Sequence, residues 1–340
     1  MGLVKAFSHI VDKEKNIKKE QCFNAAVIEL RGNRKMLSKN TLAILIFLMP
    51  TILAPLNSKG ENHETSTQLK NIAAQSRDSY SDVGYQVFKE SIYKEPFDYG
   101  VYIVNGDTPI PTEEMLKAFY DREIVKEWPS SDYGVKLIVD APGGNIASWD
   151  NIDKVNLTYC VSTKFSSRHS NVVKQMQLAT KDWESNANVK FVYDPSHDSN
   201  CIPSNSSVIF DVRPVNVNGS YLARAFFPRY PRVNRNLLID ESSFNLDPSK
   251  NLQLIGILRH EIGHTLGFRH EHTRAESGKC YEDDEWVPIS NYDAFSVIHY
   301  PQCNGLGDWS LALTLTDSNG VACLYGPPSN TLFNSAICKL

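Results

Sequence analysis

The sequence has no uncharged apolar run of the roughly 20 residues that a membrane-spanning helix requires. Its 340 residues carry a formal net charge of only −4, which gives no reason to expect nucleic acid or an anionic membrane as a partner. No Cys-x-x-Cys pair occurs, so a zinc site built from cysteines is not expected. Hydrophobic residues at 41% and charged residues at 22% instead indicate a globular protein, with one large domain plus accessory segments or with two domains.

The longest apolar run, LAILIFLMPTILAPL at 42–56, is interrupted by a proline and follows the basic stretch RGNRKMLSK. A basic flank, a short apolar core and a polar turn are the parts of a secretory signal peptide. We therefore expect translation to start at Met36, with 1–35 as an upstream extension, 36–58 as the signal peptide, and a secreted product. A membrane anchor with a short cytoplasmic tail and the rest of the chain outside the cell, or a buried apolar segment, are the alternatives.

Cysteine is nearly absent from the first 159 residues, where only Cys22 occurs, before the apolar run. An even set of cysteines beyond the predicted signal peptide indicates disulfides formed in an oxidising compartment. The sequence does not choose among their pairings. We favour Cys280–Cys303, because it closes a loop beyond the histidine-rich segment. The six are Cys160, Cys201, Cys280, Cys303, Cys323 and Cys338.

The pattern of the chain changes near residue 150. Residues 59–150 begin as a polar linker, then hold the helical stretch EEMLKAFYDREIVKEW and a Pro/Gly-bearing junction, and their pattern is too weak to predict a domain. Residues 151–340 alternate strand and helix patterns, which predicts an α/β (α+β) domain. Strands are expected at 155–161, 189–193, 207–212, 221–228 and 236–240, and helices at 170–184, capped by Ser170, and at 247–267, starting near Asp247 or Ser249.

Four of the nine histidines lie in HEIGHTLGFRHEH, residues 260–272. His260 and His264 are four apart, so on a helix they project from the same face. Gly267 falls where the helix would end, because glycine accepts the left-handed conformation of a sharp turn, and the turn brings back His270. Three neutral imidazoles leave one zinc coordination position open, as in a catalytic site. We predict one catalytic Zn²⁺ held by His260, His264 and His270.

Glu261 follows the first histidine and is expected to point beside the ion, where it can hold a metal-bound water. Zinc lowers the pKa of that water from about 15.7 toward 7. Glu261 would take the proton as the water attacks a carbonyl and would pass it to the leaving amine. The sequence thus predicts a monomeric zinc-dependent endopeptidase acting on protein or peptide substrates. An exported zinc-containing binding protein without proteolytic activity, and a metallohydrolase acting on a non-peptide amide, are the alternatives.

With SVIHYP at 296–301, the motif HExxHxxGxxH resembles the metzincin metallopeptidases, and within them the astacin-like enzymes and the bacterial peptidases named after the HEIGH string. The resemblance covers roughly residues 150–327. It implies a zincin fold with a twisted mixed sheet, an active-site helix and a C-terminal helix at 315–326. It also implies the three histidine ligands and the base Glu261. Glu271 matches an acidic residue that helps organise the mature N-terminal region.

The resemblance gives the turn at 296–301 two further roles. Ile298 stands where the family has a methionine that forms a packing floor, so an isoleucine of similar volume is expected to be tolerated. Tyr300 matches a phenol that approaches the zinc and hydrogen-bonds the tetrahedral intermediate, the alternative being a buried aromatic. His299 is expected to be structural and His272 exposed.

Two more stretches resemble family features. YIVNGD at 102–107 is similar to the propeptide stretch of astacin-like proenzymes. This resemblance implies that 59–150 are a linker and propeptide-like segment and that Asp107 takes the zinc position needed by water; the alternative is an ordinary Gly-Asp turn. ARAFFPRY, with Arg224 and Arg229, lies where metzincins keep the edge strand that pairs with extended substrate. An ordinary half-buried strand is the alternative there.

Overall fold

The computed structural model describes residues 84–121, 137–247, 249–280, 282, 285–329, 331 and 333–338, all within the compact unit Ser81–Leu340. The predicted start at Met36 and the signal or anchor segment at 42–56 lie outside these residues. Within the described part of the chain, no helix combines the length and the apolar character needed to cross a membrane.

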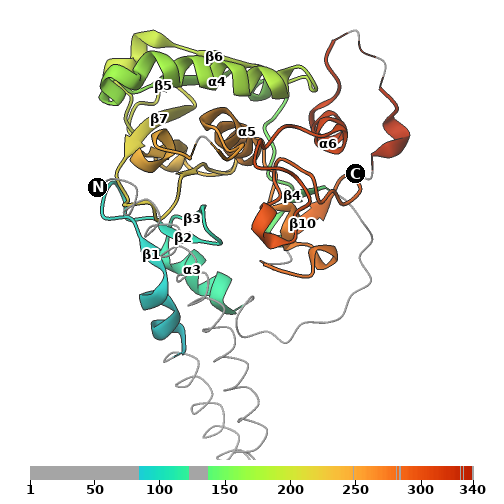
Figure 1. Cartoon of the computed structure of the whole chain (residues 1–340), viewed down its shortest axis with the longest axis horizontal. Helices are drawn as coiled ribbons and strands as arrows, with labels where there is room; N and C mark the ends of the chain where they lie inside the picture. Colours follow the sequence, from blue (N-terminus) through green and yellow to red (C-terminus); the bar gives the residue numbers. More distant parts are fainter. Residues whose placement is uncertain are drawn as a thin grey trace, which may run out of the picture. The chain divides into compact units, whose positions relative to one another are not determined.

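The largest sheet of the described chain is mixed and has five strands in the order β6-β5-β7-β9-β8. Figure 1 labels β5, β6 and β7 in its upper left part. The first four strands in this order run parallel, whereas β8 pairs antiparallel with β9 and lies at the edge. The predicted mixed α/β class is confirmed, although β8 is much shorter than the predicted 221–228. The strands are β5 (Leu157–Val161), β6 (Phe191–Tyr193), β7 (Phe210–Val215), β8 (Ala223–Arg224) and β9 (Asn236–Asp240).

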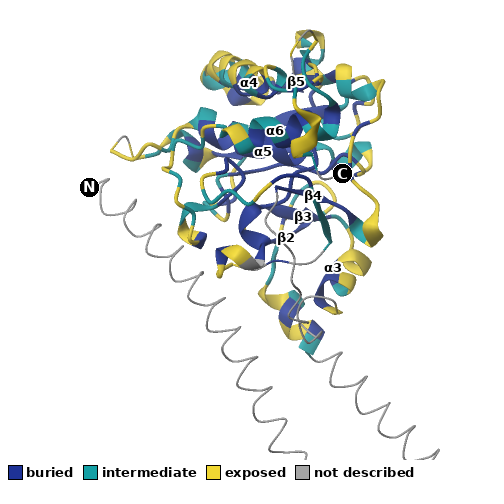
Figure 2. Ribbon diagram, turned by 90° about the vertical axis from the view of Figure 1, so that its right-hand side faces the viewer, coloured by how far each residue is buried: buried dark blue, intermediate teal, exposed yellow. Residues whose placement is uncertain are grey.

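Helices α4 (His169–Glu184) and α5 (Leu254–Thr265) pack their apolar sides into one core with the sheet. Trp183 of α4 joins the two helices, because its indole N–H donates to the carbonyl of Arg259 at 2.9 Å and its ring stacks on Phe268 with 5.6 Å between centroids. Figure 2 shows α5 almost wholly buried, while α4 keeps one exposed side. Helix α5, which carries two of the histidines, is therefore packed against α4 and the sheet.

The predicted helix starts are wrong in detail. A 3-10 turn over Thr163–Arg168 runs directly into α4, so Arg168 rather than Ser170 occupies the N-cap position. Asp247 and Ser249 do not cap α5 either, since Asp247 accepts hydrogen bonds from the backbone and hydroxyl of Ser249 and closes a local turn instead. Gln253 is the N-cap residue of α5, without a side-chain hydrogen bond.

A second, two-stranded sheet and a C-terminal helix complete the main core. Strand β4 (Ile138–Asp140) pairs antiparallel with β10 (Trp286–Pro288), and Val139 also bridges to Phe268 just after α5. The domain boundary predicted at residue 150 stays a prediction. The sheet of β4 and β10 joins residues from both sides of it. The predicted C-terminal helix is present as α6 (Leu315–Tyr325), which a capping box between Thr314 and Asp317 begins.

The propeptide-like segment forms a third sheet, in the order β1-β2-β3, followed by helix α3. Helix α3 starts where the side chain of Thr112 accepts a hydrogen bond from Met115 N–H. The elements are β1 (Tyr93–Lys94), β2 (Tyr102–Val104), β3 (Thr108–Ile110) and α3 (Glu113–Tyr120).

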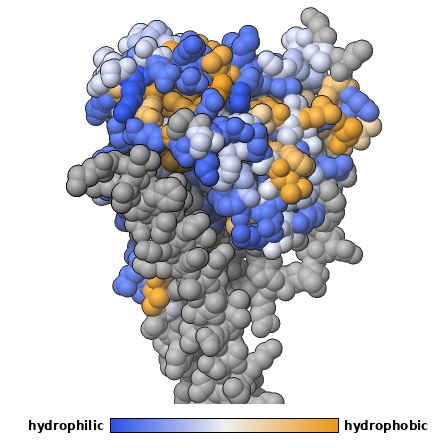
Figure 3. Space-filling model, in the orientation of Figure 1, coloured by the Kyte–Doolittle hydropathy of each residue, from blue (hydrophilic) through white to orange (hydrophobic). Residues whose placement is uncertain are grey.

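Three disulfides fasten the described chain, Cys160–Cys201, Cys280–Cys303 and Cys323–Cys338. The favoured pairing Cys280–Cys303 is confirmed. On the face seen in Figure 3 the described surface is mostly hydrophilic, and apolar residues interrupt it in separate patches.

Candidate metal centre

Helix α5 places His260 and His264 one turn apart on a buried face, where each side chain is less than 5% exposed. The helix ends directly after them. Gly267 has φ +99°, and a Cβ there would lie 2.2 Å from the carbonyl oxygen of Ala147, so the position requires glycine for both reasons. The chain then reverses, and His270 returns to the same point as the two helical histidines.

The Nε2 atoms of the three histidines converge. His260 Nε2 lies 3.2 Å from His270 Nε2 and 3.2 Å from His264 Nε2. Nitrogen ligands at about 2.0–2.1 Å from a tetrahedral zinc ion are about 3.3 Å from one another. The spacing of the three nitrogens therefore matches the edge of a zinc coordination tetrahedron.

The Nδ1 atoms of the same rings are all engaged by acceptors. His260 Nδ1 donates to the carbonyl of Val297 at 2.8 Å, and His264 Nδ1 donates to the carbonyl of Phe268 at 2.7 Å. His270 Nδ1 lies 2.5 Å from Glu282 Oε1. These acceptors favour a proton on each Nδ1, so in the neutral form that a metal ligand requires, the three rings direct their Nε2 lone pairs to one place. The residues present thus fit a zinc ion.

Glu282 is a functional residue that the sequence reasoning missed. Its carboxylate is buried and accepts from His270 Nδ1, from His272 Nε2 at 3.2 Å and from Arg269 Nη2 at 3.1 Å. Burial opposes its ionisation, but the imidazoles of His270 and His272 outweigh burial, so the pKa of Glu282 lies well below its usual range. Glu282 therefore stays a carboxylate and orients the third histidine.

The prediction that His272 is exposed is wrong. Its side chain is 2% exposed, and its ring stacks on those of His270 and Tyr300 with centroids 4.7 and 4.8 Å away. Its Nδ1 accepts the backbone N–H of Tyr300 at 3.2 Å, which leaves Nε2 to donate to Glu282. Burial lowers the pKa of His272 to about 4, so the ring is neutral at pH 7. His299 is buried too, with Tyr292 and the Tyr300 carbonyl as partners.

Glu261 is buried beside the converging nitrogens. Among the described residues its Oε2 finds no hydrogen-bond partner, an unusual position for a carboxylate oxygen. Burial and then the negative charge of Asp107 raise the pKa of Glu261 well above its usual range. An acceptor oxygen kept free inside a polar pocket is what a proton-transferring group requires.

Asp107 projects from the β2–β3 turn into the same cluster. Its Oδ1 lies 3.2 Å from His270 Nε2, its Oδ2 lies 3.5 Å from His260 Nε2 and accepts from the hydroxyl of Tyr300. The four ligand atoms of Asp107 and the three histidines all lie within 4.8 Å of one another. Gly106 precedes it with φ +96°, and a Cβ there would meet Tyr300 Oη at 3.3 Å. Gly106 and Asp107 thus form a turn, and this turn also places the Asp107 carboxylate at the histidines.

The charges around this cluster change its titration strongly. Burial lowers the pKa of His270, but the carboxylates of Asp107 and Glu282 outweigh burial and raise it to about 10. Burial and the neighbouring imidazoles lower the pKa of His264 to about 3. Burial and the charge of Asp107 raise the pKa of the Tyr300 phenol, so this hydroxyl keeps its proton.

The turn that carries Tyr300 lies directly beneath α5. Ile298 is fully buried, and its Cδ1 would lie 2.3 Å from a Cβ placed on Gly263, so the isoleucine packs against the helix at its glycine. Asp317 of α6 fixes this turn from below. It accepts from the Ser296 hydroxyl at 2.5 Å and from Val297 N–H at 2.9 Å. The fold thus holds the carbonyl of Val297, the acceptor of the His260 proton, in place.

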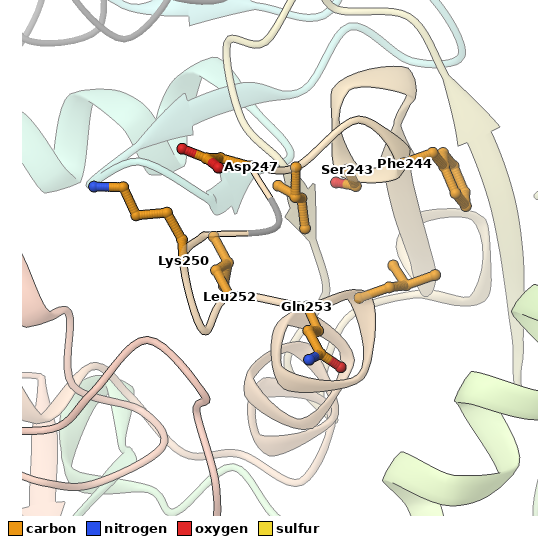
Figure 4. Close-up of a pocket in the computed structure, with 8 residues that line it drawn as sticks. Ser243, Phe244, Asp247, Lys250, Leu252 and Gln253 are labelled. Carbon is orange, nitrogen blue, oxygen red and sulfur yellow. The ribbon is translucent and has the colours of Figure 1, made fainter.

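One surface pocket of about 330 Å³ lies near the start of α5, and it contains none of the histidines (Figure 4). Its charged side chains, Asp247 and Lys250, lie on the loop before the helix, and its other walls are largely apolar. The pocket offers no cluster of metal-ligating or proton-transferring groups. Its lining is Ser243, Phe244, Leu246, Asp247, Lys250, Leu252, Gln253 and Leu254.

Comparison with known proteins agrees with this geometry. Residues 148–297 match the matrixin family model. The chain is similar to the dorsal-ventral patterning protein tolloid of Drosophila melanogaster, with 27% identity over 164 residues; the alignment covers 42% of this chain and 13% of tolloid. The chain thus spans a small fraction of that relative's length. The structure of myroilysin is matched at 16% identity over 55% of this chain and 97% of that chain, with a TM-score of 0.36, too low to carry an argument about fold. The range matched by the family model covers less than half of the chain and contains the three converging histidines and Glu261. In this range the chain is similar to zinc metallopeptidases of the metzincin type.

Proposed function

We propose that the chain is a secreted, monomeric, zinc-dependent endopeptidase that hydrolyses peptide bonds of protein or peptide substrates. The observation that supports this best is the convergence of three imidazole Nε2 atoms at zinc-ligand spacing, with a buried carboxylate that has a free oxygen beside them. His260, His264 and His270 would hold the ion. When bound, zinc polarises the substrate carbonyl and lowers the pKa of water toward 7.

Glu261 and Tyr300 carry out the proton transfer and the stabilisation of developing charge. Glu261 takes a proton from the attacking water and gives it to the leaving amine, with hydrogen bonding from the backbone of Ala225 holding its carboxylate. The protonated phenol of Tyr300, whose ring lies 5.3 Å from that of His260, donates a hydrogen bond to the carbonyl oxygen as negative charge develops there. Both groups act from buried positions, where such interactions are strongest.

Strand β8 at the sheet edge supplies a backbone for substrate. Ala223–Arg224 pairs with β9 on one side only, and the strand continues toward Ala225 beside Glu261. An extended peptide that adds to this edge would bring its scissile bond toward the histidine cluster. The edge strand β8, at the start of ARAFFPRY, thus serves as the substrate-binding strand.

We further propose that the chain is made in a latent form. Asp107 occupies the space at the three Nε2 atoms that a water would need, and it also engages the hydroxyl of Tyr300. Activity then requires that Asp107 leave, and Glu271, buried behind the third histidine, is available to organise the new N-terminal region of the mature protein. Signal-directed export through residues 42–56 is supported by the disulfides of the described chain. N-terminal sequencing of the product in the culture medium tests it.

The decisive experiment compares Asp107→Ala with Asp107→Ala/Glu261→Ala in the full chain. Bound zinc is measured by mass spectrometry and turnover with a quenched peptide or casein. We expect both variants to bind one zinc ion, the first to cleave and the second to lose about 10⁴-fold or more in turnover. Glu241→Ala, an exposed glutamate, is the matched control and should leave cleavage unchanged.

The alternatives predict different outcomes. Zinc binding without cleavage in Asp107→Ala would favour a zinc-containing binding protein. Cleavage of a non-peptide amide alone would favour the other metallohydrolase. If wild type cleaves as fast as Asp107→Ala, latency through Asp107 is wrong and the endopeptidase proposal remains.

A further inference from the structure

The propeptide-like segment packs against the central sheet at a second place, away from Asp107. Val101 and Ile103 form a small apolar cluster with Val217, Tyr221 and Leu238. Leu238 of β9 points to this cluster, whereas its neighbours Leu237 and Ile239 point to the main core with α4 and α5. The segment therefore covers the face of the sheet opposite the two helices, and β2 and β3 are buried accordingly (Figure 2).

A buried carboxylate lies at the centre of this contact. Arg224 binds Glu95 bidentately, with Nε 2.6 Å from Oε1 and Nη2 2.7 Å from Oε2, and the hydroxyl of Tyr221 donates to Oε1 at 2.6 Å. Arg224 Nη1 donates to Asn236 Oδ1 at 2.7 Å. All four side chains are at most 2% exposed. The pocket is a fork of donors shaped for one carboxylate.

Removal of the segment would leave this pocket in an unfavourable state. Arg224 would lose both hydrogen bonds to Glu95 and would keep the one to Asn236 Oδ1. While the segment still covers the pocket, separating Glu95 from Arg224 leaves a buried guanidinium without its counter-charge, which is strongly unfavourable because water does not yet reach it. The segment is therefore held by an interaction that must be broken before solvent can enter.

The other charged contacts of the segment are weaker candidates for this role. Lys89 and Glu113 pair within the segment, with side chains 28% and 48% exposed. Asp98 pairs with Arg213 of β7, with side chains 21% and 11% exposed, but Arg213 also binds Asp211 and keeps that partner without the segment. Ion pairs in contact with water contribute little, because water competes for both partners. Glu95 alone among these carboxylates is fully enclosed by the sheet.

We propose that Tyr221, Arg224 and Asn236 form a carboxylate-binding pocket through which the catalytic domain keeps the segment 84–121 as a non-covalent partner after the connecting chain is cut. The pocket recognises the side chain of Glu95, and the apolar cluster around Leu238 adds to the contact. Cleavage of the connecting chain and release of the segment 84–121 from the catalytic domain are then two separate events. The pocket acts independently of Asp107, and binding does not require peptidase activity.

The test uses the full chain with the recognition site of a sequence-specific protease inserted between Asp121 and Leu137. Every variant also carries Asp107→Ala and Glu261→Ala, so neither a metal contact nor self-cleavage contributes. After cutting, release of the segment is followed by size-exclusion chromatography and by exchange against labelled segment. We expect co-elution for the parent, and for Glu95→Gln a release about 100-fold faster.

Two further variants separate the pocket from general instability. Glu113→Gln, in the same segment but outside the pocket, should release like the parent. Tyr221→Phe keeps the ring and removes one of the three donors, and should accelerate release about 10-fold. The proposal is overturned if the parent segment leaves at once on cutting, or if Glu95→Gln and Tyr221→Phe release it no faster than Glu113→Gln.

Discussion

Replacing Glu282 by alanine measures how far the third histidine depends on a carboxylate outside the predicted ligand set. Glu282 is 5% exposed and is the acceptor for His270 Nδ1, His272 Nε2 and Arg269 Nη2. Alanine leaves the His270 proton without its acceptor. The ring is then free to rotate, and to take the tautomer in which Nε2 carries the proton and cannot bind an ion.

The expected loss follows from these contacts. Removing an outer partner of a metal-bound histidine typically weakens metal binding about 10- to 100-fold, or about 1.4–2.7 kcal/mol. Three buried donors lose their acceptor in Glu282→Ala, so we expect a loss near 100-fold. Glu282→Gln retains one oxygen for His270 and should lose only about 10-fold.

Zinc affinity is measured by competition with a chromophoric chelator, on an Asp107→Ala background so that this carboxylate does not contribute. The visible spectrum of the cobalt-substituted protein reports ligand geometry, and thermal unfolding checks that the variant is folded. Glu241→Ala serves as the exposed control. A folded Glu282→Ala protein that binds zinc within about 3-fold of its parent would refute the proposed role.

Three further outcomes are expected. Tyr300→Phe in the activated protein should lower kcat about 100-fold at unchanged zinc content; equal turnover would remove the phenol from the mechanism. Ile298→Met should change the free energy of unfolding by less than about 1.5 kcal/mol and retain zinc, since the volumes are similar; denaturant titration showing a larger loss would mean that the space under Gly263 is shaped for isoleucine. Asp317→Ala should cost about 3 kcal/mol, because Ser296, Val297 and Thr314 lose a buried acceptor; a loss no greater than that of the exposed Asp308→Ala would contradict this.

Local periodicity was enough to predict the elements that deliver two of the histidines. The apolar positions of α5 recur at helical spacing. Glycine at position 267 already predicts the end of the helix, because glycine readily adopts the left-handed conformation that Gly267 has in the structure. The helix starts were less predictable. Asp247 and Ser249 are residue types that often cap helices, but here Ser249 donates hydrogen bonds to Asp247 within a local turn. The same residue types favour helix caps and turns, so the sequence does not distinguish between them.

Contacts between distant segments could not be derived from local pattern. Glu95 and Arg224 are 129 positions apart and lie in stretches with no shared periodicity. Glu282 stands among several acidic residues, and composition does not say which one turns inward. One signal was available, however: Glu282 is two residues from Cys280, and the favoured pairing with Cys303 already placed its segment beside Tyr300. His272 was wrongly predicted to be exposed, because three other histidines already completed the predicted set of zinc ligands.

The three imidazoles do not depend equally on the fold. His260 and His264 project from a helix buried between the sheet and α4, and backbone carbonyls orient both rings. His270 lies in a loop and relies on Glu282, whose segment is fastened by the Cys280–Cys303 disulfide and by a hydrogen bond from Glu282 N–H to the Thr273 hydroxyl. Because a backbone carbonyl within regular packing moves less than a side chain on a loop, perturbation should reach the third ligand first. Opening of the Cys280–Cys303 disulfide would therefore loosen His270 and the neighbouring Tyr300 together, and would leave two helical nitrogens in place.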